Sequence, residues 1–125
     1  MIHSVKLLVT IVIVMVSFIS CTKKDSTDTE TVLSDIDITS TVTSSSIELS
    51  WKPVEGCYWY RIYIAKSGGT LKEETNFQDL INNPITYTIS GLTANTSYDI
   101  KMEGSDYATG GKLLASKTIK VSTIP

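Results

Sequence analysis

Short segments of alternating polarity, separated by turn signals, constrain the fold of this chain more than any other feature. Residues 47–51 alternate apolar and polar side chains, and residues 58–64 are rich in aromatic and β-branched side chains, as strands are. No segment keeps a sustained helical period. Further strands are predicted at residues 33–41, within the mixed segment 71–83, and at 85–90, 98–104 and 113–122. Seven short strands at this spacing predict an all-β, antiparallel, two-sheet sandwich.

Three stretches resemble the fibronectin type III family. The sequence IELSWKPV at 47–54 is similar to the second strand of that family, and YRIY at 60–63 is similar to the third. The stretch YTISGLTANTSY at 87–98 resembles the most distinctive part of the family, although Ala94 stands where proline is preferred. The resemblance covers about residues 33–123 and implies a seven-stranded fibronectin type III or immunoglobulin-like sandwich.

Strand parity predicts which side chains lie between the two sheets. The predicted inward set is Trp51, Tyr60, Ile62, Leu92, Ile100 and Met102. Tyr98 is predicted to form a tyrosine corner, in which the hydroxyl bonds a backbone group upstream while the ring packs inward. We therefore assign structural roles to Trp51, Tyr60, Leu92 and Tyr98.

The N-terminal segment has a different character from the rest of the chain. Lys6 precedes an uncharged apolar run at 7–19, and a polar stretch follows directly at 22–30. This order is typical of a secretory signal, and the run is shorter than the roughly 20 residues of a transmembrane helix. We predict a signal peptide at 1–20, a flexible tether at 21–31 and one domain at 32–125. An uncleaved signal anchor and a plain secretory signal are the alternatives.

The break after the apolar run resembles a bacterial lipobox. The sequence FISC ends at Cys21, with Phe18 where the family usually has leucine. The resemblance implies that Cys21 carries palmitate-like acyl chains, which hold a protein stably on a membrane when there are two or more. The residues after Cys21 partly resemble the export signal of Bacteroides-like lipoproteins, and a solvated linker is the alternative. The expected location is the bacterial outer membrane, on its surface or its periplasmic face.

Residue usage argues against catalysis and against nucleic-acid binding. The formal charge is −2 without a basic patch, so no nucleic-acid partner is expected. The single histidine, His3, lies in the predicted signal, which leaves the mature chain without an imidazole for a triad or a zinc site. Cys57 then lacks both an activating histidine and a disulfide partner. Asp35 and Asp37 are too few for calcium. We expect no enzyme activity, no cofactor and no metal.

One outward face offers candidate binding residues. Strand parity turns Trp59, Arg61 and Tyr63 outward, and aromatic rings beside a guanidinium can stack on sugars or anchor a protein. Tyr107, in the loop at 105–109, is a fourth candidate on an analogy of fold only. The alternative for these aromatic residues is packing on the aliphatic stems of their neighbours.

Two functions follow from these expectations. The first is a membrane-anchored, non-catalytic module for binding or adhesion, with a protein or glycan ligand. The second is a structural or accessory subunit of an envelope assembly that has no ligand of its own. Loss of a ligand on Trp59→Ala would favour the first.

Overall fold

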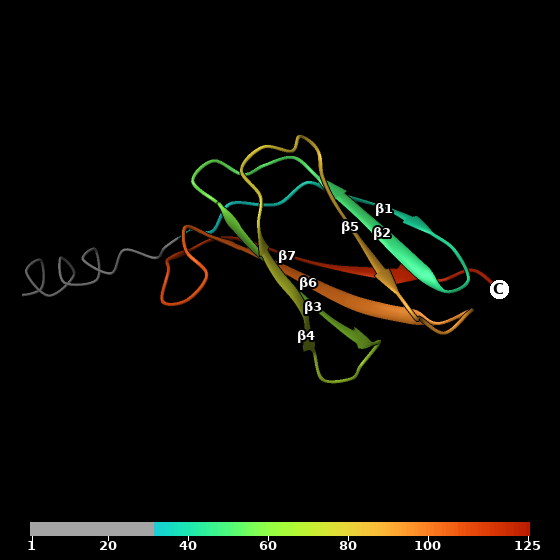
Figure 1. The fold of residues 1–125 in the computed structure, drawn as a ribbon. Coiled ribbons are helices and arrows are strands. Elements are labelled where there is room, and N and C mark those ends of the chain that lie inside the picture. Colours follow the sequence, from blue (N-terminus) through green and yellow to red (C-terminus); the bar gives the residue numbers. More distant parts are fainter. Residues whose placement is uncertain (1–31) are drawn as a thin grey trace, which may run out of the picture. The chain divides into compact units, whose positions relative to one another are not determined.

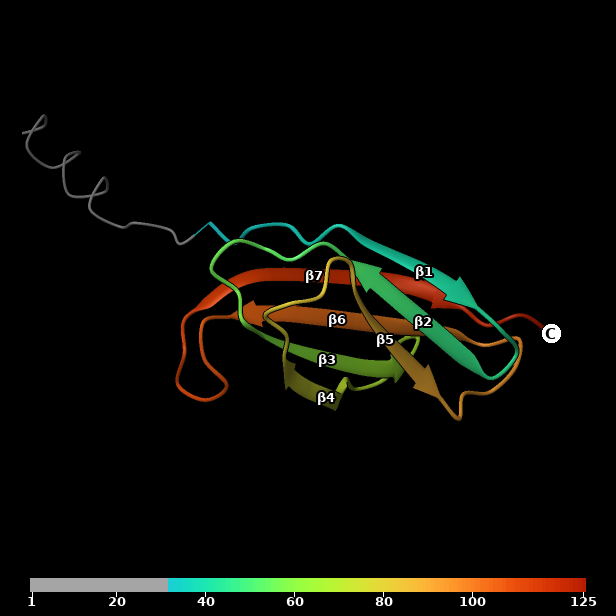
Figure 2. The same cartoon turned by 45° about the horizontal axis from the view of Figure 1, so that its top comes forward.

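The computed structural model describes residues 32–125 (Figures 1 and 2). The predicted signal peptide and nearly all of the predicted tether, Cys21 included, lie outside the described residues. Within 32–125, no helix is long and apolar enough to cross a membrane. The strands are β1 (Ile38–Val42), β2 (Ser46–Trp51), β3 (Trp59–Lys66), β4 (Lys72–Gln78), β5 (Ile85–Ser90), β6 (Ser97–Ser105) and β7 (Leu113–Ser122).

The strands form two antiparallel sheets. One has the order β1-β2-β5 and the other the order β4-β3-β6-β7. The two sheets lie over one another as layers in both views (Figures 1 and 2). This architecture confirms the predicted all-β sandwich.

The first predicted strand needs correction. A single strand at 33–41 is wrong, because β1 begins only at Ile38 and continues to Val42. Upstream, Ser34 forms a parallel bridge with Ala115 of β7, where the Ser34 amide donates to the Leu114 carbonyl at 2.9 Å. The described chain therefore runs first beside the four-stranded sheet and then crosses to the three-stranded one.

The core lies between the sheets and includes an aromatic cluster. Trp51 and Tyr60 meet edge to face, with ring centroids 5.4 Å apart. Phe77 of β4 stacks on Tyr87 of β5 at 5.9 Å and also lies against the tryptophan at 6.2 Å. Because β4 and β5 are edge strands of different sheets, the cluster packs one side of the sandwich. The fully buried large side chains are Trp51, Tyr60, Ile36, Ile47, Leu49, Ile62, Ile85, Ile89, Ile100 and Met102.

A tyrosine corner shapes the connection between β5 and β6. The Tyr98 hydroxyl accepts a hydrogen bond from the Thr93 amide at 2.9 Å, and the ring is buried. Leu92 is half-buried and packs against the core. The Thr123 hydroxyl donates to the Thr93 carbonyl at 2.6 Å, so the chain terminus closes over the same corner.

The strand register gathers three connections at the opposite end of the sandwich. Trp59, the first residue of β3, is paired with Gln78 at the end of β4 and with Ser105 at the end of β6. The connections at 52–58, 79–84 and 106–112 therefore share one end, which we call the loop end. The described chain also enters here, beside the start of β7 (Figure 1).

Candidate functional site

The outer face of the four-stranded sheet carries three of the predicted site residues. Trp59, Arg61 and Tyr63 alternate along β3, and all three are half-buried. Their cross-strand partners on β6 are Ser105, Glu103 and Lys101. Neighbouring residues therefore cover part of each of these side chains, and the cross-strand neighbour differs for each of the three.

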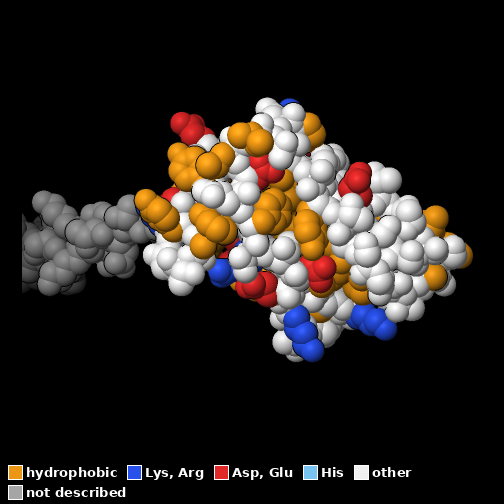
Figure 3. Space-filling view, viewed as in Figure 1, with side chains coloured by type: hydrophobic (Ala, Val, Ile, Leu, Met, Phe, Trp, Pro, Cys, Tyr) orange, Lys and Arg blue, Asp and Glu red, His pale blue; other side chains and the backbone are white. Residues whose placement is uncertain are grey.

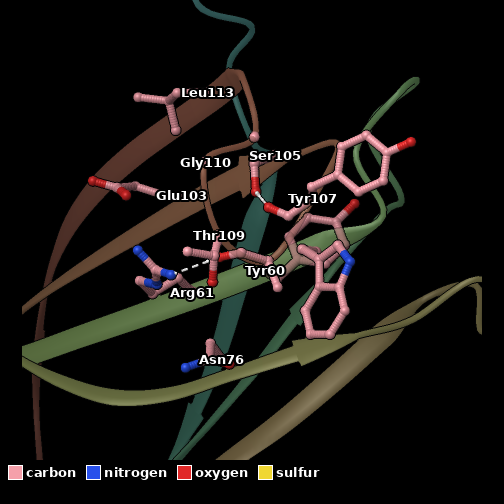
Figure 4. Close-up of a pocket in the computed structure, with 12 residues that line it drawn as sticks. Tyr60, Arg61, Asn76, Glu103, Ser105, Tyr107, Thr109, Gly110 and Leu113 are labelled. Atoms are coloured by element: carbon pink, nitrogen blue, oxygen red, sulfur yellow. Dashed lines mark hydrogen bonds between the residues drawn. The ribbon is translucent and has the colours of Figure 1, made fainter.

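Arg61 ties the sheet to the loop between β6 and β7. Its Nη2 donates to the Ala108 carbonyl at 2.9 Å (Figure 4). Its Nε lies 3.2 Å from a Glu73 carboxylate oxygen. A half-exposed ion pair of this kind contributes at most about 1 kcal/mol. The contact with the loop backbone matters more for the site, because it fixes where the loop lies. Arg61 thus positions the loop.

Tyr63 belongs to a separate cluster farther along β3. Its hydroxyl donates to Glu103 at 3.4 Å, and Lys101 Nζ lies 5.8 Å from the centre of its ring. Lys101 and Glu103 themselves form an ion pair at 2.7 Å. Tyr63 is therefore not brought together with Trp59 and Tyr107.

The loop at 106–112 is held in shape by its own contacts. The Asp106 carboxylate accepts a hydrogen bond from the Lys112 amide at 2.7 Å, and the Ser105 hydroxyl donates to the Tyr107 carbonyl at 2.8 Å. Gly110 has φ +70°, a region that favours glycine. A Cβ atom on Gly111 would lie 2.7 Å from the Tyr107 nitrogen, so a side chain cannot fit there without rearrangement.

A small cavity lies between this loop and the sheet (Figure 4). Its volume is about 170 Å³, and Arg61, Asn76, Glu103 and Thr109 are among the residues that line it. Ligand pockets for small molecules usually have about 300–1,000 Å³. This cavity is therefore too small for a ligand of that size.

A larger and more open groove lies beside it at the loop end. Its volume is about 550 Å³, within the usual range for a ligand site. The groove is lined by Tyr58, Trp59, Gln78, Leu80, Asp106 and Tyr107. Three aromatic rings thus meet one amide and one carboxylate, an arrangement that offers flat apolar surfaces together with hydrogen-bonding groups.

The structure brings together three of the four predicted binding residues and adds four groove residues that the prediction missed. Trp59, Arg61 and Tyr107 all line the small cavity, and Trp59 and Tyr107 also line the groove, whereas Tyr63 lines neither. The missed residues are Tyr58, Gln78, Leu80 and Asp106, and the exposed fractions of Tyr58 and Leu80 are 48% and 61%. Strand parity hides Tyr58, because it puts this residue on the same face as the buried Tyr60, whereas in the structure Tyr58 precedes β3 and is exposed. A signal was present in the aliphatic pair at 80–81 within a polar connection.

The ionisable groups of the described domain show no metal site or activated nucleophile. Residues 32–125 contain no cluster of three or more metal-ligating side chains. Asp35 is paired with Lys117 at 2.9 Å, and this hydrogen bond lowers the pKa of the carboxyl. Cys57 is buried, and this burial is the main cause that raises the pKa of its thiol. The negative charge of Asp106 raises the pKa further. A thiol held in its neutral form is a poor nucleophile.

The comparisons with known proteins agree with the fold. The family model of the Fibronectin type III domain matches residues 31–121. The chain belongs to the fibronectin type III family. Fibronectin type III domains are common binding and structural modules. No curated protein sequence matches the chain.

A solved structure from chicken has the same fold. The crystal structure of the chicken CNTN1 FN1–FN3 domains matches with a TM-score of 0.60 and 19% sequence identity. The match covers 75% of this chain and 33% of that chain, so this fibronectin type III domain spans about a third of the chicken structure. At this identity the likeness shows the fold alone.

Proposed function

We propose that this fibronectin type III domain is a sugar-binding module anchored to the bacterial outer membrane through Cys21. The observation that carries the binding function is the aromatic groove at the loop end. Tyr and Trp rings offer a flat apolar face with a polar edge, which suits the face of a sugar ring. Gln78 and Asp106 supply an amide and a carboxylate oxygen beside those rings, and both can bond sugar hydroxyls.

The composition of the groove favours recognition over catalysis. General acid–base work needs a group whose pKa lies near the working pH, and a histidine most often supplies it. The single histidine of the chain is His3. Fibronectin type III domains are typically non-catalytic, which agrees with a site that holds its ligand unchanged.

The membrane anchor rests on the N-terminal sequence. The apolar run at 7–19 ends two residues before Cys21, and a polar stretch follows. A lipid on Cys21 would hold the domain at the membrane without a transmembrane segment, because each buried methylene contributes about 0.8 kcal/mol.

The binding function is tested on arrays of immobilised oligosaccharides. We expect the full chain to bind a subset of sugars and Trp59→Ala to lose that binding with an unchanged unfolding temperature. Tyr63→Ala is the matched control, because Tyr63 lies on the same face of β3 outside the groove. If Trp59→Ala binds as the wild type does, the groove is not the site. If no sugar binds while a fixed protein partner co-purifies, the accessory role is supported instead.

The anchor is tested by labelling cells with a fatty acid that carries a detectable tag. We expect the chain to take up the label, Cys21→Ser to lose it and Cys57→Ser to keep it. Cys57 is the matched control because it is the only other cysteine. Unlabelled wild-type protein would contradict lipidation.

A further inference from the structure

Apolar side chains gather at the loop end (Figure 3). Tyr58, Leu80, Ile81 and Tyr107 have exposed fractions of 48%, 61%, 90% and 69%. A contiguous exposed apolar patch marks an interaction surface, whereas single apolar residues do not. At the opposite end, Ile124 is exposed by 49% and is the only large hydrophobic residue exposed there among the described residues.

Two loops at this end are built in the same way. At the base of the first, the Asp79 carboxylate accepts hydrogen bonds from the amides of Ile81 at 3.1 Å and Asn82 at 2.9 Å. At the base of the second, the Asp106 carboxylate accepts from the Lys112 amide at 2.7 Å. Both carboxylates thus bond the backbone of their own loop. The loop tips beyond them, at 80–84 and 107–111, contain no charged residue.

The chain enters the domain at this same end. Ser34 is bonded to Leu114 at the start of β7, and Val32 is exposed by 88%. Cys21 lies only eleven residues before Val32, a stretch that spans at most about 40 Å when fully extended. An anchor at Cys21 would therefore be connected to the domain at its loop end.

We propose that the loop end docks on the membrane surface, with Leu80 and Ile81 entering the boundary between headgroups and acyl chains. Tyr58 and Tyr107 lie at headgroup level, where aromatic residues with one polar end are favoured. The loop tips at 80–84 and 107–111 carry no cation, so a neutral bilayer suffices as the surface for them. This inference rests on the proposed membrane attachment and deepens the proposed function, because it places the groove where membrane-displayed sugars are found.

The test uses the full chain reconstituted into phosphatidylcholine vesicles, with brominated or ordinary acyl chains. Brominated chains quench tryptophan emission only within the bilayer. The variants are Ile81→Trp and, as the matched control, Ile124→Trp at the opposite end. We expect the added tryptophan at position 81 to be quenched by brominated lipid. The control should show only the quenching of the two native tryptophans.

The outcomes separate this inference from the proposed function. A chain that floats with the vesicles but shows equal quenching in both variants overturns docking of the loop end and leaves the anchor intact. The same result is expected if the loop end binds a protein instead of the membrane. A chain that does not float overturns the anchor and the docking together. Neither outcome affects the sugar array, which tests the groove without a membrane.

Discussion

The hydroxyl of Tyr98 shows how a single atom stabilises the connection between β5 and β6. It accepts a hydrogen bond from the Thr93 amide at 2.9 Å, and the tyrosine ring is buried. This hydrogen bond is the main cause that lowers the pKa of the phenol. Removal of the oxygen leaves the amide without its partner. We expect Tyr98→Phe to lower the free energy of unfolding by about 1–2 kcal/mol in chemical denaturation. Tyr87→Phe is the control, because the Tyr87 hydroxyl makes only an exposed contact of 3.4 Å. Equal stability of Tyr98→Phe and the wild type would contradict the corner.

The protonation of the Asp79 carboxyl makes the stability of its loop depend on pH. A side-chain hydrogen bond from Asn82 is the main cause that lowers its pKa, followed by backbone bonds from Asn82 and Ile81. A lowered folded-state pKa means that the stabilisation is present above the unfolded value of about 3.9 and is lost as the pH falls through the folded value. We therefore expect acid to weaken the hydrogen bonds to Asp79 that hold the loop at 79–84.

Asn82→Ala tests this account of Asp79. We expect the substitution to raise the titration midpoint of the Asp79 carboxyl toward about 3.9, measured by carbon-13 NMR. Asn83→Ala is the matched control, since Asn83 is exposed and makes no side-chain hydrogen bond to Asp79. A midpoint that does not move in Asn82→Ala would refute the assigned cause.

At the scale of elements, the loop at 106–112 decides whether the groove exists. Gly111 approaches the backbone of Tyr107 so closely that an added Cβ would lie 2.7 Å from its nitrogen. We expect Gly111→Ala to displace the loop, shift the NMR signals of 106–112 and weaken sugar binding at least tenfold, which corresponds to about 1.4 kcal/mol. Lys112→Ala is the control because its side chain is exposed. Unchanged loop signals in Gly111→Ala would show that the loop is not fixed as described.

The elements also show why the sequence predicts some parts of this molecule and not others. Strands such as β2 and β5 alternate clearly because one face packs on the core while the other meets solvent or lies half-covered. The segment at 33–41 misleads, because the alternation through Ile36 and Ile38 continues although the chain changes sheets between Ser34 and Ile38. Strand parity reports which face a side chain takes and carries no information on which sheet accepts the backbone.

Strand parity could predict the candidate site only where it lies on a strand, and Tyr107 of the loop was predicted on an analogy of fold. Parity identifies Trp59 as an outward residue, but it treats Arg61 and Tyr63 alike although only the arginine contacts the loop. Leu80 lines the groove because the connection between β4 and β5 brings it to the same groove as Tyr107. This is a tertiary contact, which strand parity does not predict. Loops at one end of a sandwich meet through the register of distant strands, and local sequence does not encode that register.

At the scale of the whole molecule, the two ends of the sandwich differ in character. The corner of Tyr98 and the chain terminus close one end by hydrogen bonds, among them the 2.6 Å bond of Thr123 to the Thr93 carbonyl. The loop end carries the aromatic groove, the apolar tips and the entry of the chain. A fibronectin type III domain with these two ends is suited to the proposed tether at one end, with the proposed recognition surface next to it.

The most direct test of the central claim, that the aromatic groove binds the ligand, is an NMR titration of the isotope-labelled protein with the array-selected sugars. We predict shifts of the Trp59 indole N–H and of the Tyr58 and Tyr107 amides, with the signals of β1 and of Tyr63 unchanged. Shifts confined to the three-stranded sheet or to the end with Tyr98, or no sugar that shifts any signal, would contradict the account.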